Sequence, residues 1–488
     1  MPSRISRRQL LKLGAIASAG VLAACAPKVV EKIVEKEVTK IVKEVVQETV
    51  IVAGTPQVVE KEITKIVKEV VKETVIVEAP PAEKVEEKIE IVGWGTRGFD
   101  PDVEKLKPYA DAVNAHVHAK YPNVSLKYMD MGWDEVLRQN LVTALLGGTG
   151  PDMIVGENFI QPYAEIGAFL AVDDIIEDVK DNLVEGCYAA SVVGGKAYGI
   201  CQYTACFGFE RNPNVIEKAG LDPESPPKKW SELLEQCAAI TKAGNGEYYG
   251  YTLQGPVGFL IGGILRFAIY HKTAQADLCK DNCTHPWYDN PKSEKVLAFL
   301  RELHQYTPPG LSFNPDEGQV YTQLFKGVSA YQPCGAWHLQ WAKDSGLDNA
   351  RYSTLPIPDE DGVEATGIVG NVILSAMSGT KHPAETLYFM RCCVEDDVVE
   401  HNWDCFSRFP PTRSGLNTMR PKSDEAQQMF IDLLLNADLG VLPQWRIEPN
   451  KLWTAYNDMI TKLLTTEDPI LDLMAEAQET ADKVMQAG

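Results

Sequence analysis

The chain has 488 residues, of which 45% are hydrophobic and 24% are charged, and its formal net charge is −21. This length and composition exclude a disordered chain and predict two or three globular domains with a sizeable core. Phosphate contacts need clustered lysine and arginine, so a chain this acidic is a poor candidate for binding nucleic acid.

The first 25 residues are predicted to be an export signal. A basic start precedes an apolar run that is shorter than the roughly 20 residues needed to span a bilayer. Ser6–Lys12 resembles the twin-arginine export motif, although general-secretion signals also carry paired arginines. Leu22–Cys25 resembles the lipobox of bacterial lipoproteins. We therefore expect Cys25 to be lipidated and to anchor the protein outside the cytoplasm, the alternative being an ordinary signal with a chance cysteine.

Residues 26–85 form a charged stalk with an internal duplication. Residues 33–52 recur at 58–77, with 17 of 20 positions identical. Valine and isoleucine fall at helical spacing between Glu and Lys, which permits a coiled coil, whereas β-branched residues also favour strands. We expect a solvated tether that lifts the globular part off the membrane, with self-association as the alternative. Ala79–Ala82 (APPA) marks the domain boundary.

Strand and helix patterns alternate after the stalk. Strands are predicted at 88–93, 124–129 and 152–155, and helices at 103–120 and 133–146. Strands separated by helices indicate a parallel sheet with helices on both faces. Ligands of such sheets bind beyond the carboxyl ends of the strands.

A series of short motifs then runs through the globular part. They are Gly147–Ile154, Ala164–Asp174, Gly195–Ile200, Asn212–Leu221, Pro226–Leu233, Phe325–Gly327, Gly335–Trp337 and Phe409–Arg413. In their order and spacing they resemble the extracellular solute-binding family of sugar-importing ABC transporters, the maltose-binding-protein-like receptors. Lys229 stands where the family has the threonine that caps the next helix, so that cap must come from elsewhere.

The resemblance implies an α/β fold of the periplasmic-binding-protein type, with two α/β lobes, an interlobe hinge and a ligand cleft. Lobe one is expected from 86–203 plus 366–411, and lobe two from 204–365 plus 412–488. The implied function is that of a substrate-binding lipoprotein, which captures a carbohydrate by cleft closure and delivers it to the permease subunits of an ABC importer. Neither enzymatic activity nor a cofactor is implied.

A sugar offers an apolar ring face and a rim of hydroxyls, so its site needs aromatic faces and planar hydrogen-bonding side chains. Family position and predicted loops give these ligand-binding candidates: Arg97, Glu157, Asn158, Gln202, Tyr203, Phe259, Trp337, Asn371, Arg408, Trp445 and Trp453. For each, an ordinary core or surface role is the alternative. Gly255 and Val257 stand where the family carries an acid and an aromatic, so the ligand need not be a maltodextrin. A polyol or a phosphorylated polyol stays open.

Other functions fit the sequence less well. Gly93–Gly98 matches the dinucleotide fingerprint G-x-G-x-x-G, but His118 lies where such a site needs an acid. A lipoprotein glycosidase would need two carboxylates facing one another across the cleft, roughly 5–10 Å apart. A sensory or adhesive surface protein is the third hypothesis.

The 11 cysteines fit no zinc-binding pattern, so no metal site is expected. Export permits disulfides, and Cys279 with Cys283, in a polar loop, is the best candidate pair. The connectivity of the remaining cysteines cannot be deduced from their spacing.

Overall fold

The computed structural model describes residues 29–52, 55–78, 88–95, 99, 103–132, 134–156, 160–256, 260–281, 283–360, 362–364, 366–443 and 449–487. The chain divides into two compact units between Glu87 and Lys88. The export signal, including Cys25, lies outside the described residues. Among the described helices, none combines the length and apolar character needed to cross a bilayer.

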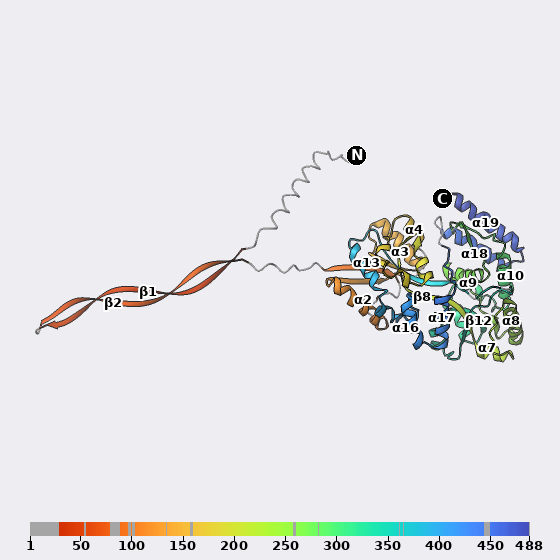
Figure 1. The fold of residues 1–488 in the computed structure, drawn as a ribbon, viewed down its shortest axis with the longest axis horizontal. Helices are drawn as coiled ribbons and strands as arrows, with labels where there is room; N and C mark the ends of the chain where they lie inside the picture. The colour runs from red at the N-terminus through yellow and green to blue at the C-terminus, as the bar shows by residue number, and fades with distance from the viewer. Residues whose placement is uncertain are drawn as a thin grey trace, which may run out of the picture. The chain divides into compact units, whose positions relative to one another are not determined.

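The stalk is a twisted antiparallel ribbon of two strands, β1 (Val29–Val52) and β2 (Thr55–Glu78) (Figure 1). Of the two conformations that the sequence left open, the strand is correct and the helix is wrong. The reason lies in the period of the pattern, since valine recurs every fourth residue from Val30 to Val50. Four is a multiple of the two-residue period of a strand, so such positions share one face. In a helix of 3.6 residues per turn the same row would rotate by about 40° per step.

The globular unit is built on one eight-stranded sheet in the order β4-β3-β5-β14-β8-β12-β9, with β13 paired to β8. The strands are β3 (Ile89–Gly95), β4 (Val124–Asp130), β5 (Met153–Gly156), β8 (Ile200–Arg211), β9 (Tyr249–Tyr251), β12 (Ser329–Gly335), β13 (Arg351–Ser353) and β14 (Val369–Ala376). The pairs β3–β4 and β3–β5 are parallel as predicted. The predicted parallel arrangement does not extend to the whole sheet, because β14 runs antiparallel to both β5 and β8.

Strand β8 belongs to two packing environments. Its first half, from Ile200 to Cys206, pairs with β14, whereas Phe207–Arg211 pairs with β12. Every residue of β8 is buried. One continuous strand therefore runs from one half of the sheet into the other.

Helices cover both halves of this sheet (Figure 1). Those that precede β8 are α2 (Lys107–Lys120), α3 (Asp134–Gly147), α4 (Ile160–Glu165), α5 (Asp173–Ile176) and α6 (Glu185–Ala189). Between β8 and β14 lie α7 (Pro213–Lys218), α8 (Trp230–Gly244), α9 (Leu260–Thr273), α10 (Ser293–His304), α11 (Glu317–Phe325) and α12 (His338–Asp344). After β14 come α13 (Pro383–Cys392), α14 (Asp396–Val399), α15 (Asn402–Phe406), α16 (Arg413–Met419), α17 (Glu425–Asn436), α18 (Pro449–Thr465) and α19 (Ile470–Ala487).

Short elements complete the unit: the 3₁₀ turns η1 (Glu104–Leu106), η2 (Lys180–Asn182), η3 (Leu311–Phe313) and η4 (Arg420–Lys422), and the strands β6 (Val192–Val193), β7 (Lys196–Ala197), β10 (Cys279–Lys280) and β11 (His285–Pro286). The three strands and two helices predicted for the first part of the unit are confirmed with small shifts at their ends.

Two large hydrophobic cores make the unit two-lobed. One core contains Ile91, Tyr109 and Phe389, around β3, α2 and α13. The other contains Trp230 and Tyr456, around α8 and α18. Each is a separate cluster of fully buried side chains, so each half of the sheet has its own apolar support.

Helix α8 begins without a capping side chain at Lys229. The carboxylate of Glu232, three residues into the helix, instead accepts the backbone N–H of Lys228 at 2.7 Å and of Lys229 at 3.3 Å. The cap that the sequence required from elsewhere therefore comes from Glu232.

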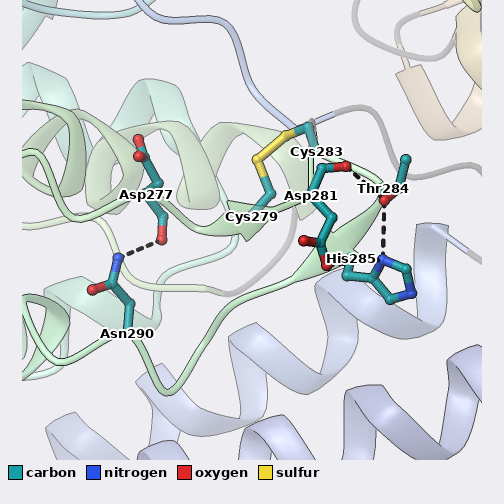
Figure 2. The surroundings of a disulfide bond; sticks show 7 residues. All are labelled: Asp277, Cys279, Asp281, Cys283, Thr284, His285 and Asn290. Carbon is teal, nitrogen blue, oxygen red and sulfur yellow. Dashed lines mark hydrogen bonds and ion pairs between the residues drawn. A yellow bond between two sulfur atoms is a disulfide. The ribbon is translucent and has the colours of Figure 1, made fainter.

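A disulfide joins Cys279, the first residue of β10, to Cys283 in the turn that precedes β11, and this is the pair that the sequence proposed (Figure 2). Between them Asp281 turns the chain with a φ of 55°. Thr284 closes the turn by donating to the carbonyl oxygen of Asp281 at 2.7 Å. The eight other cysteines of the described part of the chain are buried thiols.

Candidate ligand-binding site

A cavity of about 420 Å³ opens between the two lobes. One wall comes from η1, the end of β4 and the residues that end α15; the other comes from α12 and the residue before it. The described residues that line it are Val103, Lys105, Leu106, Tyr128, Asp130, Trp337, Gln340, Trp341, Asp344, Cys405, Phe406, Ser407 and Arg408. A cavity of this size falls within the range of small-molecule sites.

Trp337 lies where β12 turns into α12. The edge of its ring meets Phe207, with the centroids 5.6 Å apart. Its position depends on Gly335, because a Cβ added there would lie 2.0 Å from a ring carbon of Trp337. The family motif around Gly335 and Trp337 thus has a steric reason: the small residue leaves room for the indole.

Trp341 is a second aromatic side chain on the same wall. It follows Trp337 by four residues, so the two indoles lie on the same face of α12. Trp341 stacks on the ring of His338, with centroids 5.3 Å apart and an interplanar angle of 23°. Sequence reasoning missed Trp341, although its spacing from Trp337 was a signal that could have found it.

A buried polar pair supports α12 from behind. Nδ1 of His338 lies 2.9 Å from a carboxylate oxygen of Glu210, and both side chains are fully buried. Burial lowers the pKa of His338 below its ordinary value, and the neighbouring Glu210 offsets only part of that effect. The amide of Gln332 donates to the same carboxylate at 2.7 Å. This network fixes the first residue of α12 and hence the place of the indole beside it.

The opposite wall offers polar groups. Asp130 ends β4 and accepts the backbone N–H of Gly132 at 2.9 Å. Tyr128 lies two residues earlier on the same strand. On the α12 side, the amide of Gln340 donates to Asp344 at 2.7 Å. Tyr128 and Asp130 were also missed, although the carboxyl end of a strand is where ligand contacts are expected.

Arg408 joins the two walls. Its guanidinium lies 4.2 Å from the ring centroid of Trp337, a cation–π contact across the cavity. Nη1 also donates to the backbone carbonyl of Ser407 at 3.1 Å. Of the predicted site residues that the structure describes, Trp337 and Arg408 line the cavity and meet each other there.

Four predicted site residues lie in the protein core instead. Gln202 is fully buried, and Tyr203 stacks on Phe406 with centroids 4.6 Å apart. Asn371 donates to the carbonyl of Gly186 at 3.0 Å and accepts from the hydroxyl of Thr204 at 2.7 Å.

Trp453 lies in α18, is 6% exposed and contacts Tyr456 edge to face. None of these four is among the described residues that line the cavity. Arg97, Glu157, Asn158, Phe259 and Trp445 lie outside the described residues, so their ligand contacts stay predictions.

The residues present do not suggest a metal site. Among the described residues, no group of three or more His, Cys, Asp and Glu side chains could hold a metal ion.

A sheet shared by two lobes, with an aromatic and carboxylate-lined cavity between them, defines a two-lobed solute-binding protein of the periplasmic type. The sequence model of the family described as "Bacterial extracellular solute-binding protein" matches residues 102–399. This is more than half of the chain, and the protein therefore belongs to that family.

Several known proteins are similar to this chain. A binding protein of Brucella abortus (strain 2308) is 33% identical over 153 residues, which is 31% of this chain and 36% of the relative. The aligned part thus spans about a third of that relative's length. The arabinooligosaccharide-binding protein of Halalkalibacterium halodurans is 22% identical over 349 residues, or 67% of this chain and 73% of the relative.

Solved structures share the fold. The sugar-binding protein MalE of Xanthomonas citri superposes with a TM-score of 0.68 at 17% identity, covering 82% of this chain and 98% of that chain. The GacH receptor of Streptomyces glaucescens gives a TM-score of 0.66 at 18% identity, covering 82% and 99%. At these identities the likeness establishes the fold alone.

Proposed function

We propose that this protein captures a carbohydrate in the cavity between its lobes and delivers it to the permease of an ABC importer, without chemical change to the sugar. The observation that carries the proposal is the wall formed by Trp337 and Trp341, which faces the polar end of β4. Indole faces suit the apolar face of a sugar ring, and carboxylates and amides suit its hydroxyls. The oligosaccharide-binding relative and the MalE fold support the same ligand class.

The polar groups of the cavity fit hydroxyl recognition. Asp130, Gln340 and Asp344 are hydrogen-bonding side chains at least partly exposed to solvent. Each hydroxyl left without a partner in a closed cleft would cost about 1–3 kcal/mol. Lys105 and Arg408 give the cavity two cations beside its two carboxylates, so a phosphorylated polyol stays the alternative ligand class and is included in the titrations below.

Binding is proposed to act by lobe closure. Lobe one (86–203 plus 366–411) and lobe two (204–365 plus 412–488) would move about the chain crossings, which include β8. A ligand drives closure only if it binds the closed form better than the open form. The arrangement of contacts from both lobes around one cavity supports this, since only a closed cleft allows both walls to touch the same ligand.

The test is titration with a panel of mono- and oligosaccharides and a phosphorylated polyol, followed by tryptophan fluorescence and thermal unfolding. We expect at least one sugar to bind with a Kd near micromolar, roughly −8 kcal/mol. Trp337→Ala and Trp341→Ala should each weaken it at least tenfold. Trp287→Phe, which changes a tryptophan that does not line the cavity, is the control. If no sugar shifts either signal, the carbohydrate ligand is excluded.

A glycosidase is the second candidate, because Asp130 and Asp344 give the cavity one carboxylate on each wall. The same titrations test it when the sugars are recovered and analysed by mass spectrometry. We expect intact sugars. If the sugar is cleaved by the wild-type protein and not by Asp130→Asn, the protein is a glycosidase and the proposal of a binding protein without catalysis is wrong.

We also propose lipidation at Cys25, which places the protein outside the cytoplasm and on the membrane. The lipobox-like Leu22–Cys25 and the family itself support this. Cys25→Ser should move the protein from the membrane fraction to the soluble fraction. A wild-type protein that carries no acyl chain in mass spectrometry would refute the anchor.

A further inference from the structure

The β1–β2 ribbon has two open edges and apolar side chains exposed on both faces. Ile41 is 68% exposed, Val42 43% and Val45 56%, and Ile66 on the other strand is 69% exposed. A two-stranded hairpin by itself is marginally stable in water. An open edge offers unpaired backbone N–H and C=O groups to another strand. The ribbon is therefore suited to gain a further strand.

The charges of β1 are arranged symmetrically about Val42. On the face of Val42, the sequence places lysine at 32, 36 and 40 and glutamate at 44 and 48, with valine at every position between them. A basic half thus precedes an acidic half. A second β1 running antiparallel, with Val42 opposite Val42, brings Lys40 opposite Glu44 and Val38 opposite Val46.

This register is favoured over its neighbours. If the two-fold axis moved by two residues, to Lys40 or to Glu44, that residue would face its own copy, and like charges would meet. If the axis moved by one residue, Lys40 or Glu44 would face a valine of the second copy. On the other face of the strand, the symmetric register sets Thr39 opposite Val45 and Ile41 opposite Lys43, with no like charges facing. Opposite charges and paired β-branched residues across strands are stabilising, whereas like charges are not.

Near Val42 the register within one chain sets charged residues opposite uncharged ones, with Val42 opposite Lys65 and Glu44 opposite Ile63. Ion pairs inside this part of the ribbon therefore form on the diagonal, Lys65 with Glu44 and Lys43 with Glu62, each at 3.5 Å. All four side chains are more than half exposed. The carboxylate of Glu44 can therefore also reach a lysine of a strand on the outer edge of β1.

The outer edge of β1 is better suited than that of β2. The duplication gives β2 a similar charge pattern, but Pro56 interrupts its backbone donors near the start of the strand. Proline is a residue that blocks the edge of a sheet. Strand β1 contains no proline over its 24 residues.

We propose that β1 pairs antiparallel with β1 of a second copy about a two-fold axis at Val42, so that two ribbons form one four-stranded sheet and the protein dimerises through its stalk. The interaction is isologous, since the same strand contributes to both sides of the interface. The proposal does not depend on the identity of the ligand in the cleft.

The register is tested by cross-linking in the full chain, with Cys25→Ser present so that the other thiols are buried. Val42→Cys should form a disulfide-linked dimer under mild oxidation, because opposed Cα atoms in a β-pair are about 4.5–5.5 Å apart, within disulfide reach. Thr39→Cys is the matched control. Thr39 is only three residues from Val42, but in this register it faces Val45 of the second chain. The Cα atoms of the two Thr39 residues would therefore lie about 20 Å apart. Equal cross-linking of both variants would overturn the register.

Charge reversal tests the energetics. Light scattering should give twice the chain mass of 53.9 kDa for the full chain carrying Cys25→Ser. Lys40→Glu, which faces Glu44 of the second copy, should weaken dimerisation roughly tenfold. The double change Lys40→Glu with Glu44→Lys should restore it. Far-UV circular dichroism checks that each variant keeps its strands. A monomeric parent protein, or a double variant as weak as the single one, would overturn the proposal.

Discussion

The orientation of Trp337 depends on the absence of a side chain at Gly335. Gly335→Ala would place a Cβ 2.0 Å from the indole, so the ring would have to leave its place in the cavity wall. We expect sugar affinity to fall at least tenfold and the free energy of unfolding to fall by about 1–3 kcal/mol. Isothermal titration and urea unfolding measure both. Gly379→Ala, where an added Cβ meets nothing within 4 Å, should change neither.

His271 makes the stability of the second lobe sensitive to acid. Burial lowers its pKa to about 4, below the roughly 6.5 of an unfolded histidine. Between these values the unfolded chain binds a proton that the folded chain does not, so acid favours unfolding. This contribution is complete above pH 6.5 and is lost as the pH falls towards 4, at about 1.4 kcal/mol per pH unit.

A variant without His271 no longer takes up this proton on unfolding, so its stability should depend less on pH. Between pH 7 and pH 5 the wild-type protein should lose about 2 kcal/mol more stability than His271→Gln, as measured by urea unfolding. The slope is compared, since the substitution also changes the packing against Tyr456. Met459→Leu, a change in the same hydrophobic core that involves no titratable group, should leave the slope unchanged. An equal slope for His271→Gln and wild type would contradict the assignment.

At the residue scale the sequence predicted only part of the candidate site. A family motif led to Trp337, because an indole that needs a glycine two residues earlier leaves a local pattern. Arg408 was proposed without such a motif and directly precedes the segment Phe409–Arg413. Tyr128, Asp130 and Trp341 carry no such motif and become neighbours only when β4 and α12 face each other. Conversely, Asn371 was predicted to contact the ligand in the cleft, but its side-chain amide forms hydrogen bonds with Gly186 and Thr204 inside the fold. The local sequence does not distinguish a ligand contact from such a structural role.

At the scale of elements, the conformation of the β10–β11 hairpin is constrained by a disulfide bond between Cys279 and Cys283 (Figure 2). Asp281 and Cys283 both have positive φ, at 55° and 61°, a region that residues other than glycine rarely adopt. The side chain of Gln478 in α19 accepts the backbone N–H of Tyr288 just beyond the hairpin. The hairpin is therefore held by the disulfide at its tip and by α19 at its base.

Loss of the disulfide should affect stability more than binding. The bond closes a loop of only a few residues, so the chain-entropy estimate is at most about 2 kcal/mol. We expect the variant with serine at both Cys279 and Cys283 to lose up to that amount in urea unfolding and to keep its sugar affinity. Wild type measured in reductant is the control and should match the variant. A large loss of affinity would mean that the hairpin reaches the ligand.

The five elements predicted for the first part of the globular unit were accessible from the sequence, because their apolar periods are clear and local. Two other features were left open or missed, and each has a physical cause. A row of valines every fourth residue is nearly as compatible with a helix as with a strand over a short window, and only its length favours the strand. The antiparallel β14 was missed because its direction is set by the return of the chain from the other lobe, which no local pattern records.

At the scale of the whole molecule, the described lining of the candidate ligand-binding cavity belongs to the globular unit alone. All described residues that line the cavity fall between Val103 and Arg408. We expect a chain beginning at Lys88 to bind the same sugar within twofold of the full chain and to unfold at the same temperature. Titration and calorimetry of the two chains measure this. A weaker affinity of the shortened chain would place part of the site in the stalk.

The eight buried thiols have a consequence for a protein that works outside the cytoplasm. Folded, they are kept from oxidants by packing, and burial raises the pKa of thiols such as Cys206 and Cys237, which suppresses the reactive thiolate. Once the chain opens in an oxidising medium, those sulfurs can cross-link in combinations that the native fold never uses. Thermal inactivation in air should then be irreversible, and the functional lifetime of the protein outside the cytoplasm is set by the rate at which it unfolds.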